Sequence, residues 1–208
     1  MTTTVAVDGP AAAGKGTLAR RLAASLGLPY LDTGLLYRAA ARRALDAGAD
    51  PADPAAAEAA ALTLHATDLA RTDLRGPRAD AAASQVATHP GVRAALVAFQ
   101  RSFAATGAVL DGRDIGTVIL PRATVKLYVT ADPPARAHRR WLELQCRGVH
   151  VPEAQVLAEM QARDAQDAGR ATAPLRAAPD AAMLDTTHLD ADAAFARAME
   201  IVRERLHT

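Results

Sequence analysis

The fold of this chain is decided by Gly9-Pro10-Ala11-Ala12-Ala13-Gly14-Lys15-Gly16-Thr17. An apolar, β-branched run from Thr3 to Asp8 precedes this stretch, and leucines spaced four residues apart follow it from Leu18 onward. Small residues let the backbone N–H groups of such a loop turn inward around phosphate oxygens, and the following helix adds its positive end. Lys15 is placed to bridge the β- and γ-phosphates of a nucleotide. The stretch therefore predicts a phosphate-binding loop between a strand and a helix.

The residue after the lysine departs from the strict pattern of such loops. That pattern has a serine or threonine whose hydroxyl contacts magnesium, whereas this chain has Gly16 and then Thr17. We expect Thr17 to supply the hydroxyl that faces Mg²⁺. Asp111 ends an apolar strand predicted beside the loop, where a carboxylate commonly holds magnesium through water. The alternative is that Asp111 only ends its strand.

Short strand-like segments alternate with helical ones along the rest of the chain. They lie at 29–31, 108–111, 124–130 and 182–185. This alternation predicts an α/β fold of the P-loop NTPase type, a parallel five-stranded sheet flanked by helices. We expect a single domain whose core comprises 1–33, 106–132 and 173–208, with one mobile insertion at about 34–105 and a lid-like one at about 133–172.

Composition excludes several classes of protein. The chain has 208 residues and a formal net charge of +1, so it lacks the positive excess that general binding of a nucleic-acid polymer needs. No apolar stretch approaches the roughly 20 residues that span a bilayer, and we expect no membrane partner. The amino terminus shows no signal-peptide pattern, and the single cysteine, Cys146, has no partner for an internal disulfide. Both observations favour the cytoplasm.

Lysine is rare, because Lys15 and Lys126 are the only two and arginine supplies the other basic side chains. Such a bias favours the interpretation that a retained lysine is needed at its site, which fits Lys15. Lys126 lies beside a predicted strand, and we expect it at the surface.

The Gly-Lys-Gly-Thr variant at 14–17 resembles the nucleoside monophosphate kinases. The acceptor of such an enzyme is a phosphate, which is already largely ionised near neutral pH and needs no general base. The enzyme must instead overcome repulsion between two polyanions. Planar guanidinium groups meet that need, because they bind phosphate oxygens in pairs and stay charged. The arginines of the two insertions are candidates.

Further segments resemble bacterial cytidylate kinases and together cover nearly the whole chain. The most specific are Asp111-Gly112-Arg113-Asp114-Ile115-Gly116-Thr117 and the late arginines, Arg163 and Arg170. The other segments are 7–10, 31–34 with Tyr37 and Arg38, 83–87 with Val92 and Arg93, and 136–140. The resemblance implies transfer of the γ-phosphoryl group of ATP to CMP or dCMP with the help of Mg²⁺, and we expect a monomer.

The same resemblance implies a role for each candidate site residue. The acceptor phosphate would be contacted by Thr33, Arg38, Arg113 and Arg170, the cytosine ring by Ser84, Arg93 and Asp114, and the ribose by Arg163 and Asp167. Tyr37 is a further candidate for binding the acceptor. The catalytic group would comprise Lys15, Asp111, Arg113 and Arg170, and Arg139 would join residues 9–17 around ATP.

The base-reading residues suit the chemistry of cytosine. Its edge offers the N4 amine as a donor beside the N3 and O2 acceptors, so a carboxylate or hydroxyl and an arginine complete it. Uracil has an acceptor at position 4 and a donor at N3. UMP would leave buried groups unpaired, a loss of about 1–3 kcal/mol per group.

Some of these residues also have a simpler interpretation. Asp32 or Thr33 could cap the helix that follows, a role compatible with phosphate contact. Ser84 and Arg93 could be ordinary surface residues of helices.

Longer cytidylate kinases carry a small strand-rich insertion before Ser84, and here the stretch at 65–80 is short and polar. The insertion is expected to be trimmed to a turn. Because Ser84 and Arg93 follow this stretch, the change affects the orientation of their side chains.

Two adjacent arginines compete for one role. Arg139 and Arg140 point about 100° apart on a helix, so only one is expected to face the donor phosphates.

Other functions also stay open at this point. The nearest alternative is another small-molecule kinase of the same fold, acting on AMP, UMP or shikimate. A nucleotide-dependent switch or nucleic-acid-binding ATPase is a further alternative, and the near-zero net charge argues against the latter.

Overall fold

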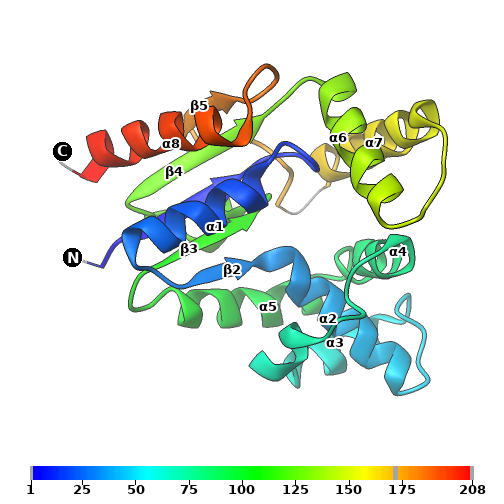
Figure 1. Ribbon diagram of the computed structural model, residues 1–208. Helices are drawn as coiled ribbons and strands as arrows, with labels where there is room; N and C mark the ends of the chain where they lie inside the picture. Colours follow the sequence, from blue (N-terminus) through cyan, green and yellow to red (C-terminus); the bar gives the residue numbers. More distant parts are fainter. Residues whose placement is uncertain (1, 171–172, 207–208) are drawn as a thin grey trace. The chain divides into compact units, whose positions relative to one another are not determined.

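The computed structural model describes residues 2–170 and 173–206 of the chain, which divides into two compact units (Figure 1). The first unit is Met1–Leu31 with Thr106–Thr208, and the second is Asp32–Ala105. Residues 171–172, at the end of the predicted lid, and residues 1 and 207–208, in the predicted core, lie outside the described residues.

A parallel sheet forms the centre of the first unit. In the described part of the chain it has five strands in the order β2-β3-β1-β4-β5. The strands are β1 (Thr4–Asp8), β2 (Tyr30–Asp32), β3 (Ala108–Gly112), β4 (Val125–Thr130) and β5 (Ala182–Asp185). β1 lies in the middle and pairs in parallel with β3 and β4. The predicted fold class is confirmed, and every strand lies within one residue of its predicted position.

One face of this sheet is covered by α1 (Lys15–Leu26) and α8 (Ala191–Leu206) (Figure 1). Leu22 of α1 and Val202 of α8 are fully buried in one apolar cluster with the valines of β1 and β4. β-branched side chains favour the extended backbone of a strand, and burial on both faces suits a parallel sheet. This core holds the carboxyl ends of the strands in a fixed register.

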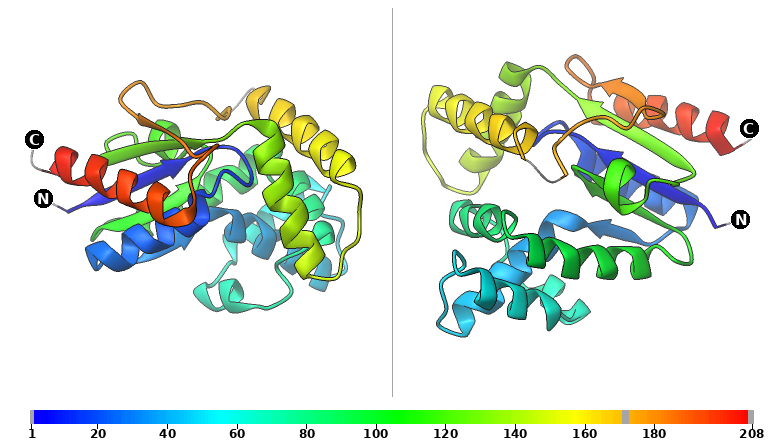
Figure 2. Two further views of the ribbon diagram at one scale, coloured as in Figure 1. Left: turned by 45° about the horizontal axis from the view of Figure 1, so that its top comes forward. Right: turned by 180° about the vertical axis from the view of Figure 1, so that it is seen from behind.

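Two helices after β4 form a hairpin in the first unit, within the predicted lid segment (Figure 2). They are α6 (Pro133–Cys146) and α7 (Glu153–Ala168). The carboxylate of Asp132 caps α6 by accepting a hydrogen bond of 2.8 Å from the N–H of Ala135. The hairpin has its own apolar cluster, which includes Leu144 and Met160 and against which Ala11 and Ala12 pack. The hairpin therefore contacts the predicted phosphate loop.

The second unit is helical in the described residues. Its elements are α2 (Thr33–Asp46), α3 (Pro54–Leu62), the short 3-10 helix η1 (Ala66–Ala70), α4 (Pro77–Val86) and α5 (Pro90–Phe103). Leu36, Val86 and Leu96 are fully buried and come from α2, α4 and α5. The segment at 65–80 contains η1 and the start of α4 and no strand among its described residues, which agrees with the expected lack of a strand-rich insertion, although a short 3-10 helix stands where a turn was expected.

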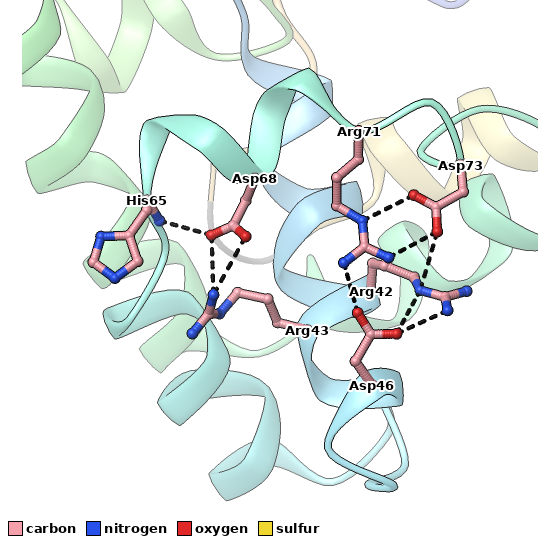
Figure 3. A network of polar contacts seen from close by, with 7 residues as sticks. All are labelled: Arg42, Arg43, Asp46, His65, Asp68, Arg71 and Asp73. Carbon is pink, nitrogen blue, oxygen red and sulfur yellow. Dashed lines mark hydrogen bonds and ion pairs between the residues drawn. The ribbon is translucent and has the colours of Figure 1, made fainter.

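A network of arginine and aspartate side chains holds this shortened segment against α2 (Figure 3). Arg71 pairs with Asp46 at 2.7 Å and with Asp73 at 2.8 Å, and Arg42 of α2 pairs with the same two carboxylates. Hydrogen bonding from Arg71 lowers the pKa of Asp73 to about 2. Charge pairing therefore fastens a turn whose composition is too polar to pack as a core.

Lys126 corrects a prediction, because it is buried in β4 and not at the surface. Its Nζ donates to the carbonyl of Pro121 at 2.7 Å and pairs with Asp180 at 2.9 Å. Its alkyl chain crosses Gly116, where a Cβ would lie 3.1 Å from the lysine Cδ. The ammonium reaches partners at the rim of the sheet while the stem stays inside.

Among the described residues, none of the helices combines the length and the apolar character that crossing a bilayer requires.

Candidate active site

The phosphate loop runs from the carboxyl end of β1 to the first turn of α1. Gly9 has φ 150°, and a Cβ there would lie 1.9 Å from the carbonyl oxygen of Val129. Only glycine permits this close passage against β4. Gly14 has φ 86° and precedes Lys15, the first residue of α1. The loop thus ends at the first turn of α1, whose N–H groups have no partners within the helix, which is the arrangement that binds phosphate.

Lys15 reaches back over this loop. Its Nζ donates a hydrogen bond of 3.3 Å to the carbonyl of Pro10. The ammonium is therefore held at the mouth of the loop. A bound phosphate would offer it stronger, charge-assisted partners at that place.

Asp111 lies beside the first turn of α1. Its Oδ2 accepts a hydrogen bond of 2.8 Å from the hydroxyl of Tyr30, and the side chain is buried. A Cβ on Gly16 would lie 3.1 Å from this same oxygen. The carboxylate therefore occupies the space into which a serine or threonine at position 16 would project. This explains why glycine follows the lysine.

The donors around this turn fit a magnesium ion. Mg²⁺ prefers oxygen ligands, and kinase sites hold it with one or two carboxylates together with the substrate phosphates. Asp111 supplies a carboxylate beside Gly16, and Thr17 supplies the neighbouring hydroxyl. Among the described residues, no group of three or more His, Cys, Asp or Glu side chains could hold a metal alone.

Asp8 is a functional candidate that sequence reasoning missed. It ends β1 directly before the loop, and its carboxylate accepts hydrogen bonds from the N–H groups of Ile115 (2.8 Å) and Gly116 (2.7 Å). Burial raises the pKa of Asp8 to about 6; the nearby Asp114 adds to this, while the two N–H groups and Lys15 oppose it. The available signal was an acidic residue closing a buried apolar strand. Asp8 ties the loop to the turn that carries Arg113 and Asp114.

Asp167 brings two predicted arginines together. It lies on α7, is almost fully buried, and forms ion pairs with Arg113 and with Arg170, the latter at 2.5 Å. The Nε of Arg170 is buried, and no hydrogen-bond partner for it is found among the described residues. A buried donor without a partner is costly unless a ligand completes it. Three residues that the sequence predicted for the acceptor thus form one cluster in the first unit.

The arginines of α6 have well-defined partners. Arg139 donates to the hydroxyl of Thr186 at 3.0 Å and to the carbonyls of Thr186 and Leu189, whereas Arg140 pairs with Glu143. The buried hydroxyl of Thr186 in turn contacts the carbonyl of Ala13 in the phosphate loop at 3.0 Å. The two arginines point in different directions, and Arg139 connects to the loop through Thr186, a residue that no sequence motif marked.

In the second unit, Asp80 connects two predicted site residues. Its carboxylate accepts a hydrogen bond of 2.9 Å from Nε of Arg38, and its backbone carbonyl accepts one of 2.9 Å from the hydroxyl of Ser84. Both site residues are half-buried. Asp80 therefore fixes the directions of an arginine and a hydroxyl on α2 and α4.

The remaining candidates of this unit are also placed by their neighbours. Arg93 is buried, with its guanidinium 5.9 Å from the ring centre of Tyr37, so it is not an ordinary surface residue. Thr33 is buried at the start of α2. Asp32 occupies the N-cap position, but its side chain makes no capping hydrogen bond and pairs with Arg75 at 3.4 Å. Asp114 of the first unit is buried, and Arg163 is half-buried on α7.

Comparisons with known proteins give one consistent family. The family model described as "Cytidylate kinase" matches residues 5–204. A cytidylate kinase of Granulibacter bethesdensis is 64% identical over 202 residues, covering 97% of this chain and 97% of the relative. A cytidylate kinase of Paramagnetospirillum magneticum is 61% identical over 207 residues, with 97% and 98% covered.

Solved structures match in fold at low sequence identity. An uncharacterized protein from Eubacterium ventriosum has a TM-score of 0.58 at 14% identity, covering 97% of this chain and 99% of that one. The protein TT1252 from Thermus thermophilus has a TM-score of 0.50 at 22% identity, with 99% and 98% covered. These two likenesses concern the fold alone.

Proposed function

Because the chain belongs to the cytidylate kinase family and transfers the γ-phosphoryl group of ATP to CMP or dCMP, we propose that its phosphate loop and the arginines paired with Asp167 carry this reaction. The observation that carries the proposal is the position of the Asp111 carboxylate against Gly16, in the turn that Lys15 opens. It puts an ammonium, a carboxylate and helix N–H groups around one loop. The products would be ADP and CDP or dCDP.

On the donor side, residues 9–17 bind ATP. The loop N–H groups and the positive end of α1 hold the β-phosphate, and Lys15 exchanges its contact with Pro10 for oxygens of the transferring group. Asp111 and Thr17 would hold Mg²⁺, which neutralises phosphate charge when it is bound. Arg139 is proposed as a further donor contact.

On the acceptor side, guanidinium groups hold the phosphate. Arg113 and Arg170 are already oriented by Asp167, and the buried Nε of Arg170 supports an anionic ligand there. The family resemblance adds Thr33 and Arg38 of the second unit. The acceptor phosphate needs no base, so positioning and charge stabilisation carry the chemistry.

Recognition of the nucleoside is assigned to a further set of residues. Ser84, Arg93 and Asp114 are proposed to read cytosine, Arg163 and Asp167 to face the ribose, and Tyr37 to support the acceptor. The burial of Arg93 and Asp114 supports this, because a buried polar group discriminates strongly against a base that leaves it unpaired.

We propose further that the enzyme is a cytoplasmic monomer whose segment at 133–172 closes as a lid and whose nucleotide monophosphate-binding insertion spans about 34–105. The hairpin of α6 and α7 supports the lid, since it carries Asp167 and leads to Arg170. The exposed thiol of Cys146 suits a reducing compartment.

A steady-state comparison of CMP, dCMP, UMP and AMP, with ATP and magnesium and coupled detection of ADP, tests the proposed function. CMP and dCMP are expected to have the highest kcat/KM. A preference for AMP or UMP would refute the assignment of the base-reading residues.

Variants sharpen this test. We expect Asp114→Ala or Arg93→Ala to raise KM for CMP and to narrow its advantage over UMP roughly 10- to 100-fold, with ATP binding nearly unchanged. Arg170→Ala is the matched comparison, because a phosphate contact is common to all acceptors and should weaken CMP and UMP alike. If Asp114→Ala and Arg93→Ala also reduce kcat/KM for CMP and for UMP by the same factor, the cytosine pocket is misplaced.

A further inference from the structure

Arg136 is a buried arginine to which the proposed reaction assigns no role. It lies on the first turn of α6, and its side chain is only 5% exposed. Its three nitrogen atoms are directed to three different partners. Nε donates to the carbonyl of Ala131 at 3.0 Å, Nη1 to the carbonyl of Ala11 at 3.3 Å, and Nη2 to the carboxylate of Asp164 at 2.7 Å. One guanidinium thus joins α6, α7 and the phosphate loop.

The contact with Ala11 fixes the direction of a peptide group in the loop. In a trans peptide, the C=O of one residue and the N–H of the next lie in one plane and point in opposite directions. Holding the Ala11 carbonyl toward Arg136 therefore directs the N–H of Ala12 away from the hairpin. A phosphate loop works through inward-facing N–H groups, and their carbonyls must face outward.

This part of the loop needs outside support. Ala12 has φ 57°, a left-handed conformation that costs roughly 1–2 kcal/mol for a residue with a Cβ. Ala11 and Ala12 also pack against the apolar cluster of the hairpin. The hairpin therefore holds the strained residue from two sides, by apolar contact and by the hydrogen bond from Arg136.

We infer that Arg136 is a positioning residue for the donor nucleotide, acting through the backbone of the phosphate loop and not by touching the reacting atoms. Asp164 fixes the guanidinium, and the guanidinium fixes the Ala11–Ala12 peptide. The inference rests on the proposed role of residues 9–17 in binding ATP. It makes the hairpin part of the donor site even before it closes.

Lysine cannot replace this arginine fully, because an ammonium is a point charge and lacks the planar fork that reaches three partners. Arg136→Lys keeps the charge and Arg136→Gln removes it. Arg147→Gln is the matched control, since Arg147 belongs to the same hairpin but is 40% exposed and pairs only with Glu143 among the described residues.

Isothermal titration with ADP measures directly how tightly the protein binds the phosphates of the donor nucleotide. We expect the Kd for ADP to rise at least tenfold in Arg136→Gln and to a smaller extent in Arg136→Lys, with Arg147→Gln unchanged. In steady-state assays KM for ATP should rise in the same order, while KM for CMP changes less than threefold. Unfolding temperatures are measured in parallel for all variants.

An ADP affinity within twofold of wild type in Arg136→Lys would overturn the inference, whatever the unfolding temperature, because Arg136 would then only brace the hairpin. An equal rise in KM for ATP and CMP would overturn it as well. If Arg136→Gln does not fold, Asp164→Asn and Arg136→Lys test the inference in its place. Asp164→Asn is expected to raise the Kd for ADP at least threefold. Failure of wild type to bind ADP would instead refute the proposed function.

Discussion

Replacing Asp8 by asparagine should change how the stability of this enzyme depends on pH. Burial raises the pKa of Asp8 from its ordinary 3.8 to about 6 in the folded protein. The shift is a little over two pH units at about 1.4 kcal/mol each, so it corresponds to about 3 kcal/mol. Between these two values the folded chain holds a proton that the unfolded chain has released. Raising the pH through this window therefore lowers the stability contributed by Asp8.

Asparagine has no such titration. The difference in free energy of unfolding between wild type and Asp8→Asn is expected to fall by about 2.4 kcal/mol from pH 4 to pH 7, because a small part of the shift lies below pH 4. Urea denaturation at pH 4, 5, 6 and 7, without nucleotide, measures this difference and cancels the other titrating groups. Asp180→Asn is the control for a carboxylate shifted the other way. Hydrogen bonding from Lys126 lowers the pKa of Asp180 below its ordinary 3.8, so the wild-type advantage there is lost only below that value and should stay nearly constant from pH 4 to pH 7.

A difference that stays constant with pH would refute this reasoning, because Asp8 would then titrate as in the unfolded chain. A difference that grows with pH would show that the two N–H groups outweigh burial. Either result would show that burial does not dominate the pKa of Asp8.

Three further changes test the proposed site. Lys15→Ala should lower kcat roughly 100-fold or more with little change in KM for CMP, since the ammonium acts on the transferring group; near-normal turnover with magnesium and ATP would disprove the phosphate-loop assignment. Limited proteolysis within 133–172 should slow when a bisubstrate analogue binds, and equal cleavage with and without it would contradict a closing lid. Gly16→Ser should raise KM for ATP at least tenfold, because its side chain would collide with Asp111, 3.1 Å from the Cβ position; an unchanged KM would mean that this carboxylate moves freely.

The sequence predicts the framework of this protein well, because the framework depends on local patterns. Apolar runs bounded by glycine and aspartate marked β1 and β3, and two glycines around a lysine marked the loop. The trimmed segment at 65–80 was visible from its polarity. Such signals are contained within a few neighbouring residues.

Contacts between distant residues were not predictable in the same way. The position of the Asp8 carboxylate depends on two N–H groups that lie 107 and 108 residues away in the chain. The position of the Thr186 hydroxyl depends on a loop carbonyl 173 residues away. Lys126 was expected at the surface because it lies beside a predicted strand. Its partner, Asp180, follows 54 residues later, so no local pattern indicated that the lysine is buried. No single-chain periodicity shows where such a side chain finds its partner.

Asp167 gives the proposed acceptor cluster a resident counter-anion. Arg113 and Arg170 share this carboxylate, which offsets the repulsion between their charges. An arriving phosphate must divide the guanidinium donors with Asp167, and the carboxylate opposes it as a like charge. If the proposed site is right, binding of the acceptor phosphate is an exchange of anions and not the filling of a bare positive site. The carboxylate of Asp167 lowers the net positive charge of the cluster, so it limits how tightly any bound phosphate is held.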